Sequence, residues 1–349
     1  MSAAPTAAPG TARVLRFAPA KLNLTLAVVG RHDYGYHALH SVMIPLAFGD
    51  AVALSVAPGG ASADTLRITG LPLAATPDNL VLRAIAATRD AVRATRPGAP
   101  ADPPLLAARL TKRIPVEAGL GGGSSDAAAT MAAALEAWGA ALPAGELRNL
   151  AASLGSDVPF FLAGGAALVT GRGEVVEPLP DLQGEAPAVL IVTPRLPMST
   201  PAVFAAYAGG ARPATSGLAA SERLVAELQA CLSGAMLLAR AEELAAANDL
   251  LPAALQVAPA LAIFRAALGR IVGRPVGQSG SGPTAWVLYP SLATARKAAR
   301  FVRLGIRDGS LPSIGGGEPF VAVSTILSGE SHIDRAGAHN GGRTLSKGR

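Results

Sequence analysis

Hydrophobic and polar residues alternate in several short segments in the first half of the chain. The clearest segment is 21–29, where leucine or valine recurs at every second position between asparagine, threonine and alanine. A period of two residues is typical of a strand with one buried face. We therefore predict strands at 21–29, 52–56 and 66–68, and apolar runs in the same half add strands at 106–114, 166–170, 175–177 and 188–192.

Longer segments with apolar residues three and four positions apart predict helices. They occupy 79–92, 127–138 and 146–154 in the first half, and 220–232, 236–247, 259–271 and 292–302 in the second, where strands are expected at 284–289 and 320–323. This mixed order, without strict βαβ alternation, indicates an α+β fold.

A stretch rich in Pro, Gly, Ser and Thr, at 194–216, separates the two parts of the chain. Such composition is typical of a connection between units, so we expect a domain boundary near residue 190. The expected domains are 13–190 and 191–330. Residues 1–12 are expected to form a disordered arm, and residues 331–349 a disordered basic tail.

A glycine-rich loop connects the strand expected at 106–114 with the helix expected at 127–138. Its residues, with Asp126 following, are Pro115, Val116, Glu117, Ala118, Gly119, Leu120, Gly121, Gly122, Gly123, Ser124 and Ser125. Glycine allows positive φ and close approach of the backbone to a ligand, and the helix N-terminus offers free N–H groups, so the loop is expected to bind phosphate. A Walker A loop is excluded because no lysine follows the glycines, and the dinucleotide fingerprint lacks its last glycine. A flexible linker is the less favoured alternative.

Composition restricts the class of protein further. Half of the 349 residues are hydrophobic, which is enough for a sizeable core. The net charge is +6, and residues 332–349 contribute +3 of it (four cations and one acid). The rest of the chain has no long basic run and no interleaved aromatic residues, so we do not expect nucleic-acid binding.

Cysteine and histidine give no sign of a disulfide or a structural metal. The single cysteine, Cys231, cannot form an internal disulfide, and the five histidines do not combine with it in a metal-binding pattern. We also find no convincing signal peptide and no apolar stretch long enough to span a bilayer. We therefore expect a soluble, cytoplasmic protein without a membrane partner.

Two polar residues stand next to apolar segments. Lys21 opens the first predicted strand beside Asn23, where a desolvated ammonium needs an anion, although a lysine that extends to solvent from a strand end is an alternative. Asp157 precedes Pro159 and an apolar run, a pattern that on its own favours a helix N-cap over catalysis. The pair at 248–249, Asn-Asp, is interpreted in the same way, as a helix cap and not as catalytic support.

Six motifs, in this order, resemble those of the GHMP small-molecule kinases. They are Pro-Ala-Lys-Leu-Asn-Leu at 19–24, Gly-Tyr-His-Ala-Leu at 35–39, Gly-Leu-Gly-Gly-Gly-Ser-Ser-Asp at 119–126, Leu-Gly-Ser-Asp-Val-Pro-Phe-Phe at 154–161, Asn-Asp-Leu at 248–250 and Gly-Ser-Gly-Pro at 280–283. The resemblance extends over residues 18–323. It implies a two-domain α+β fold, with an N-terminal domain like ribosomal protein S5, a ferredoxin-like C-terminal domain and an active site in the cleft between them.

The resemblance implies an ATP-dependent kinase for an alcohol group, with Mg²⁺ accompanying ATP as co-substrate. In similar enzymes the aspartate that matches Asp157 is the general base toward the substrate hydroxyl, and the lysine that matches Lys21 lies beside it. The loop at 115–125 would surround the ATP phosphates, with the hydroxyls of Ser124 and Ser125 toward the phosphates or Mg²⁺. A loop of backbone N–H groups together with Mg²⁺ suffices for phosphoryl transfer, because this reaction requires mainly alignment of the groups and neutralisation of their charge. No metal site built from side chains alone is expected.

The first two motifs resemble the branch of this family that phosphorylates the 2-hydroxyl of a cytidine-diphosphate-linked methylerythritol in the non-mevalonate route to isoprenoid precursors. The resemblance implies that Tyr36 and His37 hold the cytosine, one by stacking and one by hydrogen bonding, and that Phe204 supplies a second aromatic wall. The other residues implied on the substrate side are Asn23, Thr200, Gly280, Ser281 and Gly282. The implied partners are this conjugate and ATP, and the protein is expected to be a monomer or a homodimer.

Two departures from the family pattern and two alternatives accompany this interpretation. Tyr34 stands where relatives usually have aspartate, and residues 116–118 replace a run that is often richer in glycine, which predicts fewer backbone contacts from that half of the loop. One alternative is a GHMP kinase for homoserine or mevalonate, whose substrates offer no base to stack on Tyr36. The other is an inert nucleotide-binding homologue, against which the presence of both Lys21 and Asp157 argues.

Overall fold

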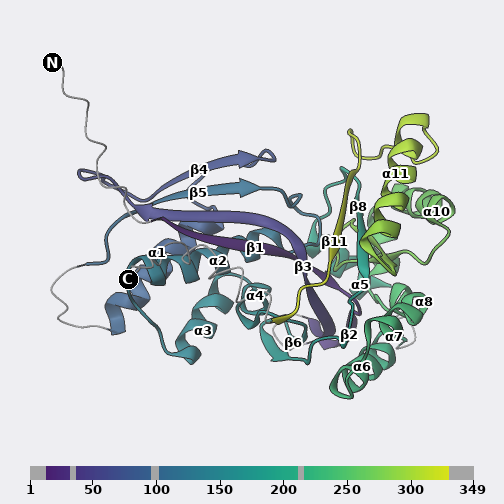
Figure 1. Ribbon diagram of the computed structural model, residues 1–349, viewed down its shortest axis with the longest axis horizontal. Helices are drawn as coiled ribbons and strands as arrows, with labels where there is room; N and C mark the ends of the chain where they lie inside the picture. The colour runs from purple at the N-terminus through teal and green to yellow at the C-terminus, as the bar shows by residue number, and fades with distance from the viewer. Residues whose placement is uncertain (1–12, 32–36, 96–101, 211–215, 330–349) are drawn as a thin grey trace, which may run out of the picture.

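The protein is described here from a computed structural model, which covers residues 13–31, 37–95, 102–210 and 216–329. Within these residues the chain forms two sheets that lie side by side (Figure 1). The first sheet contains β1 (Val14–Asn23), β2 (Ala27–Arg31), β3 (His37–Val56), β4 (Thr65–Gly70), β5 (Leu106–Lys112), β6 (Ala167–Gly171) and β7 (Val175–Pro178). The second contains β8 (Ala188–Thr193), β9 (Gly277–Gln278), β10 (Ala285–Tyr289) and β11 (Phe320–Thr325), in the order β11-β8-β10-β9.

The helices also fall into two groups. Those beside the first sheet are α1 (Leu80–Thr95), α2 (Gly122–Ala137), α3 (Ala144–Leu154) and α4 (Val158–Ala163). The second half adds α5 (Thr200–Gly209), α6 (Ser216–Gln229), α7 (Gly234–Ala239), α8 (Ala241–Ala246), α9 (Leu251–Val257), α10 (Ala260–Val272) and α11 (Leu292–Asp308). Among the residues described, none of these helices has the length and apolar character needed to cross a bilayer.

Strand β3 organises the first sheet. It is 20 residues long and pairs with β1, β2, β5 and β6. The sequence predicted only its last part, 52–56, because residues 41–46 are buried on both faces and therefore show no alternation. A strand covered on both sides carries no period of two in its hydrophobicity.

The single strand predicted at 21–29 is wrong. Strand β1 ends at Asn23 and β2 begins at Ala27. Between them, the Thr25 hydroxyl accepts the Val42 N–H at 3.0 Å, and the Leu26 N–H donates to the Ala247 carbonyl at 2.7 Å. Asn23 and Thr25 are both 1% exposed, so the polar positions of the pattern mark buried hydrogen bonds and not a solvent-facing side.

Most predicted helices occur, with different ends. Helix α2 begins at Gly122 and not at 127, so the last glycines belong to its first turn. The helix predicted at 236–247 is two short helices, α7 and α8, that meet at Arg240. Helices α5 and α9 were not predicted. The Ser199 hydroxyl accepts the Ala202 N–H at the start of α5, and Pro201 lies in its first turn, so residues interpreted as connecting composition start a helix.

The core is continuous from one sheet to the other. Alternate residues of β8 point into two different clusters: Val189 and Ile191 pack with Leu22 and Ile44 of the first sheet, whereas Leu190 and Val192 pack with the helices over the second sheet. All six residues of β8 are buried. The change from one sheet to the other falls between β7 and β8, and the boundary near residue 190 stays a prediction.

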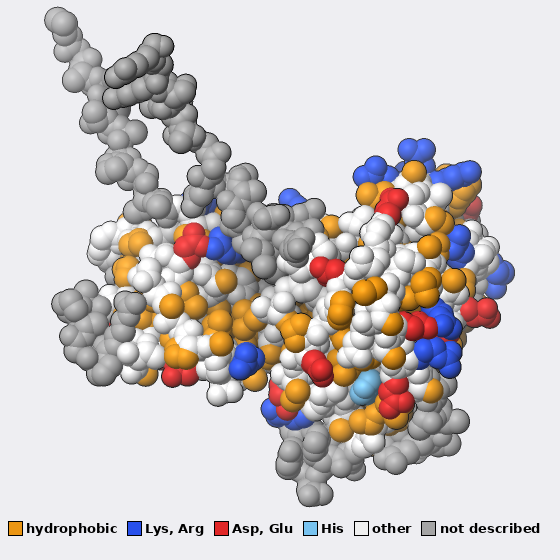
Figure 2. Space-filling view, turned by 60° about the horizontal axis from the view of Figure 1, so that its bottom comes forward, with side chains coloured by type: hydrophobic (Ala, Val, Ile, Leu, Met, Phe, Trp, Pro, Cys, Tyr) orange, Lys and Arg blue, Asp and Glu red, His pale blue; other side chains and the backbone are white. Residues whose placement is uncertain are grey.

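Charge is less evenly distributed than the sequence suggested. Helix α11 alone carries five exposed cationic side chains and one acid, Asp308. The cations are Arg296, Lys297, Arg300, Arg303 and Arg307. Figure 2 shows basic side chains gathered at the right-hand end of the molecule, where Figure 1 places α10 and α11. The expected N-terminal arm and basic tail lie outside the described residues.

Candidate active site

A cavity of about 530 Å³ opens between the first sheet and α5, and we call it the acceptor cavity after the substrate that the resemblance implies there. Eight of the residues predicted for catalysis or substrate binding line it: Lys21, Asn23, His37, Asp157, Thr200, Phe204, Gly280 and Ser281. Tyr36 and Tyr34 lie outside the described residues. Arg172, in the turn between β6 and β7, also lines the cavity and was not predicted, because nothing in its local sequence distinguishes it from a surface arginine.

Lys21 and Asp157 form an ion pair at the wall of the acceptor cavity. The Lys21 Nζ lies 3.4 Å from Asp157 Oδ2, and it donates a hydrogen bond of 2.8 Å to Asn23 Oδ1. The lysine side chain is 5% exposed, whereas that of Asp157 is 30% exposed. Asn23 is held in turn by Ser41, whose hydroxyl accepts from Asn23 Nδ2 at 2.8 Å. The ammonium is therefore fixed within the protein, and the carboxylate faces the cavity.

Asp157 occupies the N-cap position of α4, as its sequence pattern predicted. Its side chain, however, makes no hydrogen bond to the helix N-terminus. An N-cap residue stabilises a helix through such a bond. The carboxylate is thus free of a capping role and remains available to a ligand in the acceptor cavity.

Two aromatic rings line the far part of the acceptor cavity. His37 and Phe204 are stacked, with ring centroids 5.1 Å apart and an angle of 26° between the planes. Tyr207 meets His37 edge-on at 5.9 Å. At the other end of this wall, the Thr200 and Ser281 hydroxyls lie 2.9 Å apart and connect α5 with the loop at 277–282. The segment that sequence analysis treated as a connection therefore forms one side of the cavity.

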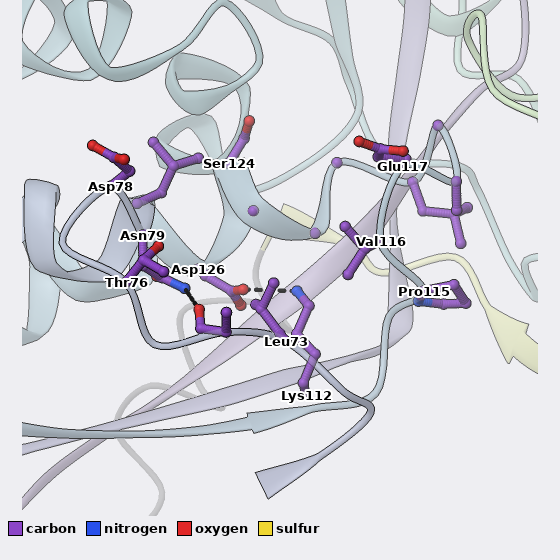
Figure 3. Close-up of a pocket in the computed structure, with 18 residues that line it drawn as sticks. Leu73, Thr76, Asp78, Asn79, Lys112, Pro115, Val116, Glu117, Ser124 and Asp126 are labelled. Atoms are coloured by element: carbon purple, nitrogen blue, oxygen red, sulfur yellow. Dashed lines mark hydrogen bonds and ion pairs between the residues drawn. The ribbon is translucent and has the colours of Figure 1, made fainter. Parts of the chain in front are cut away.

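A second cavity of about 450 Å³ lies on the other side of the glycine loop (Figure 3), and we call it the nucleotide cavity after the ligand that the resemblance implies there. Residues 115–124 line it together with Leu73, Thr76, Asp78 and Asn79, which the sequence analysis did not single out. Ser125 does not line it: this residue is 1% exposed, and its hydroxyl has no hydrogen-bond partner among the described residues. Of the two serines, only Ser124 faces the nucleotide cavity.

The glycine loop is the wall between the two cavities. Gly119 and Gly121 line both of them, with φ of +80° and +68°. A Cβ at Gly119 would lie 2.3 Å from the Ser279 carbonyl oxygen, and one at Gly121 would lie 2.8 Å from Phe161 Cζ. Gly282 does not line the acceptor cavity but packs against this wall, where a Cβ would lie 2.5 Å from the Gly119 nitrogen. Only glycine fits these positions.

Glu117 shows what the departure at residues 116–118 does to the backbone. Its φ is +54°, in the left-handed region that glycine adopts without cost. The loop therefore keeps the conformation of a glycine-rich run while carrying a strained glutamate, whose side chain lies at the edge of the nucleotide cavity (Figure 3). The backbone conformation is retained here at the expense of stability.

A buried cluster of three ionisable side chains lies at the wall of the nucleotide cavity and was not predicted. The Lys112 Nζ donates to Asp50 Oδ2 at 2.6 Å and to Asp126 Oδ2 at 2.7 Å, the second shown in Figure 3. Asp50 also accepts the N–H groups of Arg113 and Ile114 at 2.5 and 2.8 Å. Burial raises the pKa of Asp126 to about 8, against the opposing effect of the Lys112 ammonium. The available signal was that the chain has only four lysines and that one of them, Lys112, comes shortly before the glycine loop.

The interpretation of Asn248 and Asp249 as helix caps is wrong. Helix α9 has Leu250 at its N-cap and no side-chain cap bond. Asn248 Oδ1 accepts the Leu250 N–H just before the helix, and the other polar side-chain atoms of the pair bind other segments of the chain. Asn248 Nδ2 donates to the carbonyls of Gln278 and Gly280, and Asp249 Oδ2 accepts the Val28 N–H.

Comparison with known proteins agrees with the motifs. Residues 79–165 match the family model described as GHMP kinases N terminal domain. The 4-diphosphocytidyl-2-C-methyl-D-erythritol kinase of Paramagnetospirillum magneticum is 41% identical over 287 residues, which cover 81% of this chain and 91% of that protein.

Solved structures agree with the expected fold. A crystal structure of 4-(cytidine 5'-diphospho)-2C-methyl-D-erythritol kinase matches with a TM-score of 0.63 and 30% identity, over 89% of this chain and 99% of that one. A homoserine kinase from Cytophaga hutchinsonii reaches the same TM-score of 0.63 at 19% identity, covering 93% of this chain and 99% of that one, which shows the fold alone. The predicted α+β GHMP fold is confirmed. The chain belongs to the family of 4-diphosphocytidyl-2-C-methyl-D-erythritol kinases within the GHMP kinases.

Proposed function

We propose that this protein transfers the γ-phosphoryl group of ATP to the 2-hydroxyl of 4-(cytidine 5'-diphospho)-2-C-methyl-D-erythritol, a step in the non-mevalonate route to isoprenoid precursors. Membership of the family supports the substrate. One observation carries the chemistry: the Lys21–Asp157 pair, with 3.4 Å between its charged atoms, lies in a cavity that only a glycine loop separates from the nucleotide cavity.

In the proposed reaction, Asp157 acts as the general base. Its carboxylate takes the proton of the acceptor hydroxyl as the hydroxyl oxygen bonds to the γ-phosphorus, and the bond from that phosphorus to the bridging oxygen breaks to release ADP. The Lys21 ammonium stabilises the negative charge that develops on the attacking oxygen. Asn23 Oδ1, 2.8 Å from Lys21 Nζ, orients the ammonium and leaves its other protons for the reacting groups.

The nucleotide is proposed to bind with its phosphates on the loop at 119–123 and at the N-terminus of α2. The backbone N–H groups of a helix N-terminus can bind an anion such as phosphate. Mg²⁺ fits this site as an ion bound mainly by the nucleotide, because no group of three acidic, His or Cys side chains suited to a metal occurs in the described part of the chain. The Ser124 hydroxyl is one of the protein oxygens that would face it. When bound, Mg²⁺ neutralises phosphate charge.

Cytosine is proposed to bind at the aromatic end of the acceptor cavity, against His37 and Phe204. Their ring centroids are 5.1 Å apart, whereas a base between two rings needs roughly 7 Å, twice the contact distance of stacked carbon atoms. A base can therefore stack on the outer face of Phe204 directly, and binding between the two rings requires them to separate. The ring nitrogens of His37 supply the hydrogen-bonding partner for the base.

A coupled assay of ADP release tests the proposed function. The purified protein with Mg-ATP is given the cytidine-diphosphate conjugate, homoserine or mevalonate in separate reactions. We expect ADP release with the conjugate and none above background with the other two. Turnover of homoserine or mevalonate without turnover of the conjugate would refute the proposal.

A further inference from the structure

The pair Asn248 and Asp249 is buried between the segments that build the acceptor cavity, although neither residue lines it. The two residues are 6% and 7% exposed. They lie between α8 and α9, and the following residue, Leu250, lines the acceptor cavity. A buried polar pair of this kind is costly unless each group has a partner, so its partners indicate what it holds in place.

Asn248 uses its whole side-chain amide. Its Nδ2 group donates to the carbonyls of Gln278 at 3.1 Å and Gly280 at 3.0 Å, and its Oδ1 accepts the Leu250 N–H at 2.9 Å. Both donors therefore bind one short loop. An asparagine is suited to this task because its NH₂ group has two donors in fixed geometry, which an acid or a hydroxyl cannot replace.

The loop that Asn248 holds lies against the proposed reaction centre. The Ser279 hydroxyl donates to the Gly119 carbonyl at 2.8 Å and accepts the Asn23 N–H at 3.3 Å. A Cβ at Gly280 would lie 3.4 Å from Asn23 Oδ1 and 3.7 Å from Lys21 Nζ. The loop backbone is thus in direct contact with the residues around the lysine, and Asn248 supports it from the opposite side.

Asp249 fixes the other end of this arrangement. Its Oδ2 accepts the Val28 N–H at 3.0 Å, and its own N–H donates to the Leu26 carbonyl at 2.9 Å. Its Oδ1 lies beside Gly217, the second residue of α6, where a Cβ would come within 2.5 Å. The pair is therefore anchored to Leu26, in the connection that follows Asn23, and to Val28 in β2.

We propose that Asn248 is a positioning residue of the acceptor site: it holds the loop at 278–281 against Lys21 and Asn23 so that Gly280 and Ser281 are placed to receive the acceptor substrate. This inference rests on the proposed function for the identity of that substrate. It assigns to Asn248 a role in acceptor binding, which acts through the loop and not through contact with the reacting atoms. Asn248 and the loop at 278–281 do not line the nucleotide cavity, and the Ser279 hydroxyl reaches it only through its bond to the Gly119 carbonyl, so ATP binding should change much less than acceptor binding.

Steady-state kinetics of Asn248→Asp test the proposal. The exchange keeps the shape of the side chain but sets a carboxylate against two carbonyl oxygens, which drives the loop away. We expect the KM for the acceptor to rise tenfold or more, with kcat lowered to a smaller degree and the KM for ATP within twofold of the wild type. Asn248→Ser, which removes the two amide donors without adding charge and leaves one shorter hydroxyl, should give the same pattern if the aspartate variant does not fold.

Asp64→Asn is the matched control. Asp64 forms a buried pair with Arg89, at 2.5 Å, and neither residue lines the acceptor or the nucleotide cavity. This variant should lose stability without any change in either KM. If an Asn248 variant loses stability to the same degree and keeps the wild-type KM for the acceptor, Asn248 is a structural residue only and the proposal is overturned.

Hydrogen exchange separates this proposal from the proposed function. In the protein without substrate, Asn248→Asp should speed amide exchange at 277–283 at least tenfold, while Asp64→Asn leaves that segment unchanged. Trp286, whose ring lies against Gly277, provides a second signal through its fluorescence. Unchanged exchange in this loop would overturn the positioning role even if the kinase activity is as proposed. Faster exchange in a protein that does not phosphorylate the conjugate would refute only the proposed substrate and would still support the positioning role of Asn248.

Discussion

Replacement of Asp157 by asparagine separates a catalytic role from a structural one. The substituted side chain keeps the size of the original and loses the ability to take a proton. A general base typically contributes 10²–10⁴-fold to a rate, which corresponds to about 3–5 kcal/mol of transition-state free energy. We therefore expect kcat to fall by about two to four orders of magnitude. The affinity for ATP should not change, because Asp157 does not line the nucleotide cavity.

The effect of Asp157→Asn on stability follows from two features of the structure. Asp157 makes no side-chain bond to the N-terminus of α4, so no capping energy is lost. The Lys21–Asp157 charges, 3.4 Å apart, attract by about 1 kcal/mol at the dielectric constant of water and by about 5 kcal/mol at a dielectric constant of 20. Loss of the carboxylate leaves the buried Lys21 ammonium without its anion, which costs about 3–5 kcal/mol in a fully buried pair. Because Asp157 is 30% exposed and Asn23 Oδ1 still accepts from Lys21 Nζ, we expect the free energy of unfolding to fall by no more than about 3 kcal/mol.

The measurements are kcat from coupled ADP release, ATP affinity from calorimetry, and unfolding free energy from urea titration. Asp181→Asn is the control, because it removes a carboxylate in the same way, but Asp181 accepts the Gly329 N–H and lines neither the acceptor nor the nucleotide cavity. A variant of Asp157 with kcat within tenfold of the wild type would refute the assignment of the base. A large loss of stability with unchanged kcat would show that the residue is structural.

Three further predictions concern the walls of the site and one buried acid. Gly121→Ala should lower the unfolding free energy, measured by urea titration, by roughly 1–3 kcal/mol more than Gly139→Ala does. The reason is that a Cβ at Gly121 would lie 2.8 Å from Phe161, whereas a Cβ at Gly139 would have nothing within 4 Å. Equal losses in the two variants would contradict this prediction. Phe204→Ala should raise the KM for the acceptor about tenfold and leave that for ATP unchanged, which initial rates can check; a rise in both would place Phe204 outside the acceptor wall. Burial raises the pKa of Asp249 above its ordinary value of 3.8, so the native state binds this proton more tightly than the unfolded chain. The free energy of unfolding should therefore fall by at most about 1.4 kcal/mol per pH unit as the pH rises from 3.8 to the raised pKa, and it should stay level above that pKa. Asp249→Asn should lack this slope. Parallel curves of unfolding free energy against pH for the two proteins would contradict the prediction.

The local pattern of hydrophobic and polar residues was sufficient to predict secondary structure wherever a segment's own residues determine it. The strand before the glycine loop was predicted from its apolar run and the helix after it from apolar residues three and four positions apart, and the loop itself was identified from the freedom of glycine. The connection at 194–216 was misinterpreted because proline and serine occur in loops and in the first turn of helices alike. In α5 the Ser199 hydroxyl accepts the Ala202 N–H, and this single bond distinguishes the two cases.

Residues that act through distant partners could not be predicted in this way. The partners of Lys112 are 62 and 14 positions away in the sequence, and those of the Asn248 amide nitrogen are 30 and 32 positions away. No local period records such contacts. The resemblance to a family brought together Lys21, Asp157 and the loops, which local reasoning alone kept apart. It did not indicate that Asn248 binds a loop, because a motif specifies which residues occur and not what they hold.

The glycine wall between the two cavities has a consequence for inhibitors and for evolution. Because Gly119 and Gly121 present only backbone to either side, no side chain there can be exchanged to tune one pocket without altering the other. Resistance to a compound that contacts this backbone on both sides has few mutational routes, whereas a compound held by the Phe204 side chain can be lost through one substitution. A bisubstrate ligand that spans the two cavities would therefore bind the part of the site that is least free to change.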